Sequence, residues 1–259
     1  NDNGTIWSPG WKPCKTPLDF YECRHGMSYT RITGAKNSIE ASILFFVPLN
    51  TWGEVQKMTL RNTSNEKKHF KLFSMAEWCL WNAATDMENF QRNFSTGEVE
   101  VDGSVIYHKT EYKERRNHYA FYSVNAPIQG FDTDRESFIG LYNEFRDPQQ
   151  VIEGQPANSI AHGWSPIASH YLEIELEAGE SKEYVFLWGY VENEQDEKFA
   201  EETPGLLHSG SSPIINKKKA KALISALDTS EKVDAAFAEL KAYWDDLLDI
   251  YVLKSEEEK

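Results

Sequence analysis

Planar polar side chains alternate with aromatic rings in one short stretch of the chain, residues 78–93. Its polar members are Asn82, Asn89, Gln91, Arg92 and Asn93, and its aromatic members include Trp81 and Phe90. Amides and a guanidinium can pair with neighbouring hydroxyl groups, and aromatic rings can pack on the C–H faces of a pyranose. The stretch therefore favours sugar binding, although aromatic residues at the end of a strand can equally fill a core.

Two pairs of acids raise the question of glycoside hydrolysis: Asp86 with Glu88, and Asp132 with Asp134. Hydrolysis needs two carboxyl groups on either side of the scissile bond, one of them kept protonated by its surroundings. Closeness in sequence provides neither condition. We expect these acids to be solvated or to cap local structure.

Histidines and cysteines offer two further kinds of site. In a mutarotase-like sandwich a histidine protonates the sugar ring oxygen while a carboxylate takes the anomeric proton, which makes His108 and His170 candidates. Nothing around them in the sequence distinguishes them from structural histidines. The three cysteines lack zinc spacing, and Cys23 has only His25 beside it, so we expect buried inert thiols and no metal. No nucleotide-binding, serine-hydrolase or metalloprotease motif occurs, and no cofactor is predicted.

Strands must position these residues, because most of residues 1–190 alternates between apolar and polar side chains. The sugar-binding stretch continues an apolar run over residues 70–81, and residues 37–49 form a second run that becomes apolar on both faces. Many such runs, joined by turns and without helical crossovers, indicate an antiparallel β-sandwich.

The clearest pattern of this kind spans residues 171–191. Leu172, Ile174 and Leu176 alternate with glutamates, a turn falls at residues 178–181, and aromatic residues then alternate again. The pattern predicts a β-hairpin.

Helical patterns follow residue 192. Residues 217–227 predict a helix, with the lysines of residues 217–219 on its solvated face. Asp228 with Glu231 predicts the capping box of a second helix. The apolar stripe of that helix comprises Val233, Phe237, Leu240, Trp244, Leu247, Leu248 and Tyr251. The stripe needs an apolar surface to cover it, either the sandwich or something outside this chain.

Composition excludes several classes of protein. The 259 residues can bury a core without disulfides, and three cysteines point to a reducing compartment. A formal net charge of −14 repels nucleic acids and anionic membranes. No apolar run is long enough to span a bilayer, and the first residues do not resemble a signal peptide. We expect an acidic, soluble, cytoplasmic protein that binds neither nucleic acid nor membrane.

The strings at residues 78–83 (WCLWNA) and 89–93 (NFQRN) resemble the N-terminal domain of inverting cellobiose phosphorylases. That glycoside phosphorylase family also holds the chitobiose and cellodextrin phosphorylases. Further strings resemble the same family in order along the chain: WSPGWKP (7–13), YECRHG (21–26), YTRITG (29–34), LFFVPL (44–49), STGEVE (95–100), YHKTEY (107–112), GFDTDR (130–135) and GWSPI (163–167). The resemblance extends from about residue 4 to 252, and the segment near 199–213 is longer than is usual in the family.

The resemblance implies a mainly β fold, an antiparallel super-sandwich of the galactose mutarotase type over residues 1–215. Residues 216–259 would then form a helical linker to an (α/α) barrel that this chain does not contain. In the family the barrel carries the aspartate that acts as general acid, within a Trp-Asn-Asp string absent from this sequence. We therefore expect no catalytic residue here, and no activity from this chain alone.

The resemblance also implies a reaction: cellobiose and inorganic phosphate give α-glucose 1-phosphate and glucose, with inversion. Phosphate is the co-substrate and the nucleophile, so one acid suffices and no cofactor is needed. Arg92 matches the family arginine that contacts the leaving, or acceptor, sugar, and Asn89 and Gln91 lie beside it. In related homodimers this stretch reaches an active site at the subunit interface, either its own or that of the partner subunit.

Two other functions stay open at the level of sequence. The chain could be a carbohydrate-binding module without chemistry, or a dimerisation domain that shapes the mouth of the barrel. Within the family, chitobiose or cellodextrin could replace cellobiose as the substrate.

Overall fold

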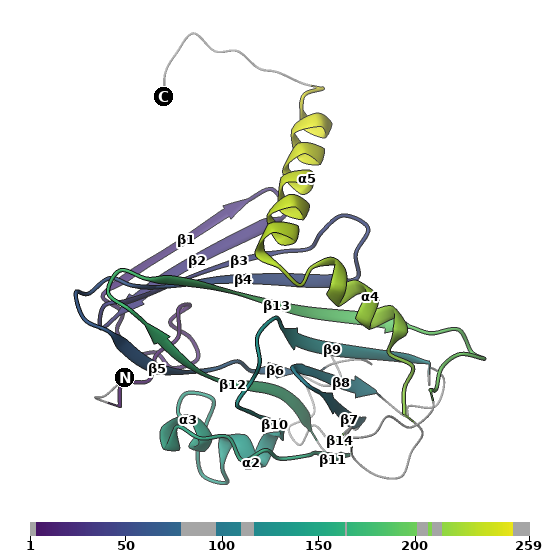
Figure 1. Cartoon of the computed structure of the whole chain (residues 1–259), viewed down its shortest axis with the longest axis horizontal. Helices are drawn as coiled ribbons and strands as arrows, with labels where there is room; N and C mark the ends of the chain where they lie inside the picture. The colour runs from purple at the N-terminus through teal and green to yellow at the C-terminus, as the bar shows by residue number, and fades with distance from the viewer. Residues whose placement is uncertain are drawn as a thin grey trace.

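Two antiparallel β-sheets face each other, and two C-terminal helices cover the outer face of the larger sheet (Figure 1). The computed structural model describes residues 4–78, 97–109, 117–163, 165–200, 207–208 and 214–250. The larger sheet runs in the order β1 (Phe20–Gly26), β2 (Tyr29–Lys36), β3 (Ile39–Phe46), β4 (Gly53–Asn62), β13 (Ser181–Glu192), β9 (His118–Val124), β8 (Val105–Lys109), β7 (Gly97–Asp102) and β11 (His162–Gly163), with β14 (Leu207–His208) also on β7. The smaller sheet runs in the order β10 (Gly130–Asp134), β12 (Pro166–Leu176) and β5 (Lys68–Phe73), with β6 (Ala76–Glu77) also on β12. The predicted fold class, an antiparallel β-sandwich followed by helices, is confirmed.

The larger sheet is covered on both faces along its central strands. In β13, Phe186 and Trp188 face the smaller sheet, whereas Val185 and Leu187 face the C-terminal helices. β3 shows the same division, because Ala41 packs between the sheets and Phe46 under the helices. Strands buried on both faces need apolar residues at consecutive positions, which explains the continuous apolar runs in the sequence.

The pattern over residues 171–191 forms two strands, as predicted, but the predicted hairpin is wrong. β12 pairs with β10, β5 and β6 in the smaller sheet, whereas β13 pairs with β4 and β9 in the larger one. The turn between them, with Gly179 at a φ of 74°, carries the chain from one sheet to the other. Leu172 and Phe186 therefore share one core from opposite sheets.

The predicted apolar run over residues 70–81 is divided between β5 and β6 as far as residue 78, and residues 79–81 lie outside the described residues. Ser74 interrupts it: its hydroxyl lies 2.9 Å from Nδ1 of His170 and accepts a hydrogen bond from the backbone N–H of His170 at 3.0 Å. Phe70 before the break and Trp78 after it both pack between the sheets. Side chains on both sides of Ser74 therefore remain packed in the same core.

Two short helices that the sequence did not predict follow β10: α2 (Arg135–Ile139) and α3 (Gln149–Glu153). Phe138 packs with Ile167 on the side of the smaller sheet that faces away from the main core. Asp134 caps α2 by accepting a hydrogen bond from the backbone N–H of Ser137 at 2.9 Å.

The C-terminal helices are α4 (Lys218–Ala226) and α5 (Ser230–Leu248). The N-cap of α5 is Thr229, whose hydroxyl accepts from the backbone N–H of Lys232 at 3.3 Å, so the capping box predicted at Asp228 is wrong by one residue. Asp228 instead accepts a hydrogen bond from Nζ of Lys232 at 2.7 Å. No helix among the described residues is long and apolar enough to cross a membrane.

The apolar stripe of α5 is covered only along its first part. Val233 and Leu240 are buried, and the ring of Phe237 lies 5.1 Å from that of Phe46. Leu247 and Leu248 are 44% and 48% exposed. The sandwich therefore covers the beginning of the stripe and leaves its end open within the described residues.

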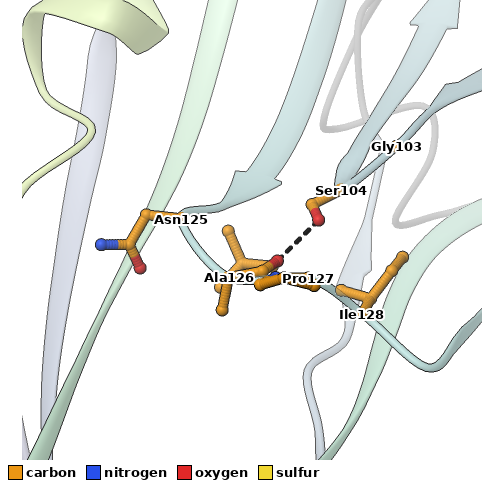
Figure 2. Close-up of a pocket in the computed structure, with 7 residues that line it drawn as sticks. Gly103, Ser104, Asn125, Ala126, Pro127 and Ile128 are labelled. Atoms are coloured by element: carbon orange, nitrogen blue, oxygen red, sulfur yellow. Dashed lines mark hydrogen bonds between the residues drawn. The ribbon is translucent and has the colours of Figure 1, made fainter.

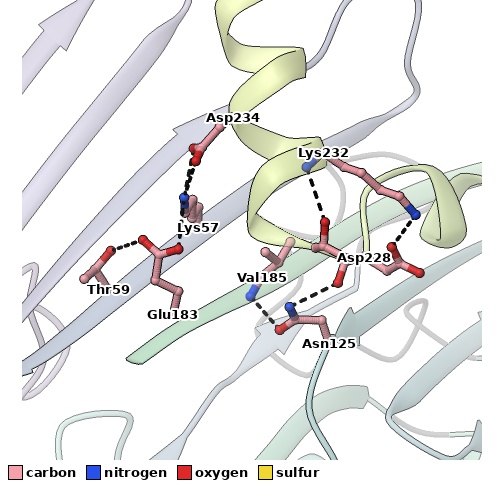
Figure 3. A network of polar contacts seen from close by, with 9 residues as sticks. Lys57, Thr59, Asn125, Glu183, Val185, Asp228, Lys232 and Asp234 are labelled. Atoms are coloured by element: carbon pink, nitrogen blue, oxygen red, sulfur yellow. Dashed lines mark hydrogen bonds and ion pairs between the residues drawn. The ribbon is translucent and has the colours of Figure 1, made fainter. Parts of the chain in front are cut away.

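Polar contacts fix the start of α5 to the sheet (Figure 3). Nζ of the buried Lys57, on β4, lies 2.8 Å from Asp234 and 3.2 Å from Glu183. Burial lowers the pKa of Lys57, and the hydrogen bonds to these two carboxylates outweigh that effect, so its pKa lies above the ordinary value. Asn125 adds a second tie by accepting from the backbone N–H of Val185 and donating to the carbonyl of Asp228.

Candidate functional site

The predicted sugar-binding residues Arg92, Asn89 and Gln91 lie outside the described residues, and so do Asp86 and Glu88. The structure describes the residues on either side of the segment 79–96, which contains these five residues. Trp78 precedes the segment and follows β6 of the smaller sheet, and Gly97 follows the segment at the start of β7 in the larger sheet. We refer to Trp78 and Gly97 as the two ends of the stretch with Arg92, which therefore connects one sheet to the other.

The imidazole of His108, on β8, contacts both ends of that stretch. The indole of Trp78 stacks on it, with 5.4 Å between ring centroids and 10° between ring planes. A Cβ added to Gly97 would lie 2.1 Å from Cε1 of His108, so only glycine fits at this position. We call this arrangement of Trp78, Gly97 and His108 the clamp.

A buried cluster of charges ties β7 to the start of α4. The carboxylate of the fully buried Glu100 lies 3.0 Å from Nζ of Lys109 and 2.5 Å from Nζ of Lys217, and accepts a hydrogen bond from the backbone N–H of Ile215. Lys109 also contacts Glu98 at 3.2 Å. Glu100, Lys109 and Lys217 are buried from water, and Glu98 at the edge of the cluster is half-buried, so the two acids and two lysines balance each other. Lys217 is buried, and the prediction that it lies on a solvated helix face is wrong.

Sequence reasoning missed both the clamp and this cluster. Glu98 and Glu100 alternate with valines in a strand whose interior positions are buried, and a carboxylate at a buried position needs a cationic partner. The alternation of glutamates with valines is the signal that points to a buried ion pair. It does not identify Lys109 and Lys217 as the partners. For the clamp, Gly97 within the strand indicated a close approach of another group.

His108 and His170 are both buried, which does not suit proton transfer to a sugar. Burial lowers the pKa of each imidazole to about 3, because the charged form would lose its hydration. The ring of His170 lies 5.0 Å from that of Tyr122 within the core. The structural role that the sequence left open fits both side chains, and the mutarotase-like role does not.

The acids at residues 132 and 134 were expected to be solvated or to cap local structure; Asp134 is a cap, whereas Asp132 is buried and not solvated. Asp132 is fully buried and accepts hydrogen bonds from the backbone N–H groups of Ala157 and Ser159 and from the Ser159 hydroxyl. Burial raises the pKa of Asp132, and these hydrogen bonds partly offset the effect. Asp134 caps α2.

The described cysteines do not form a metal site. Sγ of Cys23 lies 3.5 Å from Nε2 of His25. No group of three histidine, cysteine or acidic side chains in the described part of the chain could hold a metal ion. Cys14 and Cys23 are half-buried thiols, so the expectation that they are buried is wrong. Cys79 lies outside the described residues.

Two cavities in the described part of the chain lack a shielded acid. The first, of about 520 Å³, lies beside the turn between β7 and β8 and is lined by no titratable side chain. Figure 2 shows the Ser104 hydroxyl at its wall, which donates a hydrogen bond to the carbonyl of Ala126. The second, of about 740 Å³, lies between the N-terminal segment, β5 and α3. The acid that lines it, Glu153, is exposed and accepts a hydrogen bond from Gln149. Neither cavity therefore encloses an acid away from water.

Comparison with known proteins decides the family. The profile described as "Glycosyl hydrolase 94, supersandwich domain" matches residues 1–203 of this chain. The chain belongs to the glycosyl hydrolase 94 family. The supersandwich match covers both sheets described above except β14, together with the stretch that carries Arg92.

Relatives of this glycosyl hydrolase 94 chain include two kinds of phosphorylase. The chain is 28% identical to a solabiose phosphorylase of Paenibacillus borealis, over 75% of this chain and 25% of that protein. It is 26% identical to an N,N'-diacetylchitobiose phosphorylase of Vibrio proteolyticus, over 98% of this chain and 29% of that protein. Among solved structures, a protein from Escherichia coli K12 assigned as an aldose 1-epimerase has a TM-score of 0.34 at 8% identity, covering 67% of this chain and 69% of that one. The chain thus spans little more than a quarter of the length of the relatives it matches.

Proposed function

We propose that this chain is the N-terminal domain of a disaccharide phosphorylase that converts cellobiose and phosphate into α-glucose 1-phosphate and glucose with inversion. The family match over residues 1–203 supports the class of enzyme. The observation that carries the role of this chain is the clamp, which holds both ends of the stretch with Arg92 against one buried imidazole.

The proposed reaction divides its tasks between domains. Phosphate attacks the anomeric carbon from one face, the glycosidic C–O bond breaks, and an aspartate of a catalytic barrel gives its proton to the leaving glucose oxygen. Among the described acids, Glu153 beside the second cavity is exposed, and Asp132 is tied to the backbone N–H groups of Ala157 and Ser159, which supports a proton donor outside this chain. The task of this chain is to bind the acceptor sugar: Arg92 donates charged hydrogen bonds to its hydroxyl groups, with Asn89 and Gln91 beside it.

The experiment uses the full-length enzyme that contains this chain, assayed for α-glucose 1-phosphate in the presence of inorganic phosphate. Cellobiose, N,N'-diacetylchitobiose and solabiose are compared by kcat/KM. The highest value for cellobiose supports the proposal, and a higher value for another disaccharide overturns the proposed specificity. Absence of phosphorolysis with all three overturns the function itself. The isolated chain should release no α-glucose 1-phosphate.

We also propose that the enzyme works as a homodimer in the cytoplasm. The sparse cysteines and the half-buried thiols of Cys14 and Cys23 suit a reducing compartment. The open end of the α5 stripe, at Leu247 and Leu248, provides apolar surface for the barrel or for a second subunit. Sedimentation of the full-length enzyme measures the subunit number directly.

A further inference from the structure

Trp52, directly before β4, is the most exposed tryptophan that the structure describes. It is 73% exposed, and Trp11 follows at 43%. Its indole is nevertheless ordered by contacts, because it stacks on Tyr190 of β13 with 6.0 Å between centroids and 29° between planes. The backbone N–H of Tyr190 also donates to the carbonyl of Trp52 at 2.9 Å. The exposed indole of Trp52, held on the half-buried ring of Tyr190, leaves apolar area in water that a ligand would cover.

The buried side of this pair is rigid. The Tyr190 ring lies 5.9 Å from that of the buried His118 on β9. Two residues before Tyr190 on the same face of β13, Trp188 packs edge-on against Trp78, with 5.9 Å between centroids. The exposed rings therefore belong to the face of the larger sheet on which the clamp also lies.

Carboxylates flank the rings on both strands. Side chains two residues apart share one face of a strand, so Trp188, Tyr190 and Glu192 lie on one face of β13. Glu54 of β4 is the register partner of Trp188 and lies on the same face, two residues after Trp52. The hydroxyl of Tyr190 donates to Glu192, and Nε2 of Gln56 donates to Glu54 at 2.8 Å. These bonds orient both carboxylates, and a carboxylate can accept several hydrogen bonds at once.

We propose that Trp52 and Tyr190 form a second saccharide subsite that binds a neutral pyranose ring of a gluco-oligosaccharide. The C–H face of the sugar packs on the indole, and the equatorial hydroxyl groups of glucose donate to Glu54 and Glu192. Two carboxylates beside the rings repel a uronic acid or a sugar phosphate, so the ligand is uncharged. The subsite is built from Trp52, Tyr190 and their neighbours, without Arg92, and the proposal holds whether or not the proposed phosphorolysis is correct.

The experiment is a titration of the ¹⁵N-labelled chain with cellotetraose, followed through the indole N–H resonances. The resonance that disappears in Trp52→Ala identifies Trp52, and it is expected to move with cellotetraose and to stay in place with a tetragalacturonate. Trp52→Ala should weaken cellotetraose binding at least tenfold, whereas Trp11→Ala, which removes another exposed indole, should leave it unchanged. Thermal unfolding of each variant verifies that it is folded.

The charge argument has its own test. Glu54→Gln with Glu192→Gln should raise the affinity for tetragalacturonate relative to cellotetraose. A Trp52 resonance that does not respond to cellotetraose, or equal weakening by Trp52→Ala and Trp11→Ala, overturns the subsite. Tight binding of tetragalacturonate by the unmodified chain overturns the choice of a neutral ligand. Whether the full-length enzyme carries out phosphorolysis changes neither the expected Trp52 response nor the expected preference for a neutral sugar, so the two proposals can fail separately.

Discussion

Trp78 and His108 stack almost face to face, with 10° between their planes, although they lie far apart in the sequence. Trp78 leaves the smaller sheet and His108 belongs to the larger one, so this contact joins the two sheets at the point where the candidate sugar-binding stretch begins. Because Gly97 lies against the same imidazole, the stretch also ends there. A single side chain thus sets both ends of the segment on which the proposed acceptor site depends.

Gly97→Ala should destabilise the chain. The added Cβ would lie 2.1 Å from Cε1 of His108 and 2.7 Å from the carbonyl oxygen of Lys109, so both the imidazole and the backbone must move. Overpacking of this kind costs about 1–3 kcal/mol in the free energy of unfolding. Urea unfolding measures the loss. Gly10→Ala is the matched control, because its Cβ would meet nothing nearer than 3.9 Å and it should change stability little. Equal stability of the two variants would contradict the clamp.

Acid should destabilise the fold through its buried histidines. His108 and His170 have a folded-state pKa of about 3, against 6.5 in the unfolded chain, so between these values only the unfolded state binds their protons. The stability contributed by each is fully present above pH 6.5 and falls as the pH drops toward 3, by about 1.4 kcal/mol per pH unit for each proton.

The measurement is urea unfolding at a series of pH values from about 4 to 7, the range between the folded and unfolded pKa values. His108→Gln should reduce the slope of stability against pH by about one proton, because glutamine does not titrate. His170→Gln, at the other buried imidazole, should reduce the slope by a similar amount. An unchanged slope in His108→Gln would show that this imidazole is not held neutral.

Breaking the buried charge cluster should be costly. Lys217→Met leaves the buried carboxylate of Glu100 with one lysine fewer, and removing one member of a buried ion pair costs about 3–5 kcal/mol. Lys221→Met is the control, since its contact with Asp102 lies at the surface and such pairs contribute about 1 kcal/mol or less. The double variant Glu100→Gln with Lys217→Met should lose less than the two single variants added together. Additive losses would mean that the two side chains do not interact.

Sequence patterns predicted the strands better than their partners. Alternation at Leu172 and Phe186 identifies the buried face of each strand, and the structure confirms both faces. It does not say which strand lies beside which, so two strands joined by a short turn were predicted to pair although they belong to opposite sheets. The capping box failed for a similar reason, because Thr229 and Asp228 are both good N-cap residues and only the geometry selects between them.

Prediction of the candidate site was limited in a different way. Lys217 belongs to a run of three lysines, which is typical of a solvated helix face. Its burial is explained only by its contact with the buried carboxylate of Glu100. Trp52 lies in no motif, and its exposure depends on where β4 begins in the sheet. Arg92, by contrast, was assigned a role only through its match to a family string, and that role remains a prediction.

Arg92→Ala in the full-length enzyme tests that role. If its guanidinium donates charged hydrogen bonds to the acceptor sugar, their loss should cost about 1–3 kcal/mol, a decrease of roughly 5- to 150-fold in kcat/KM for cellobiose. In the reverse reaction, the KM for glucose as acceptor should rise while the KM for α-glucose 1-phosphate changes little, because the proposal assigns donor binding to the barrel and not to Arg92. Arg61→Ala, at an exposed arginine on β4, is the matched control and should leave both constants unchanged.

Arg92→Lys should restore only part of the lost affinity, since a lysine side chain keeps the charge and loses the bidentate geometry. Kinetics of Arg92→Ala equal to those of the unmodified enzyme would favour a purely structural role for this domain, and an equal rise in both KM values would point to a general disturbance of the active site.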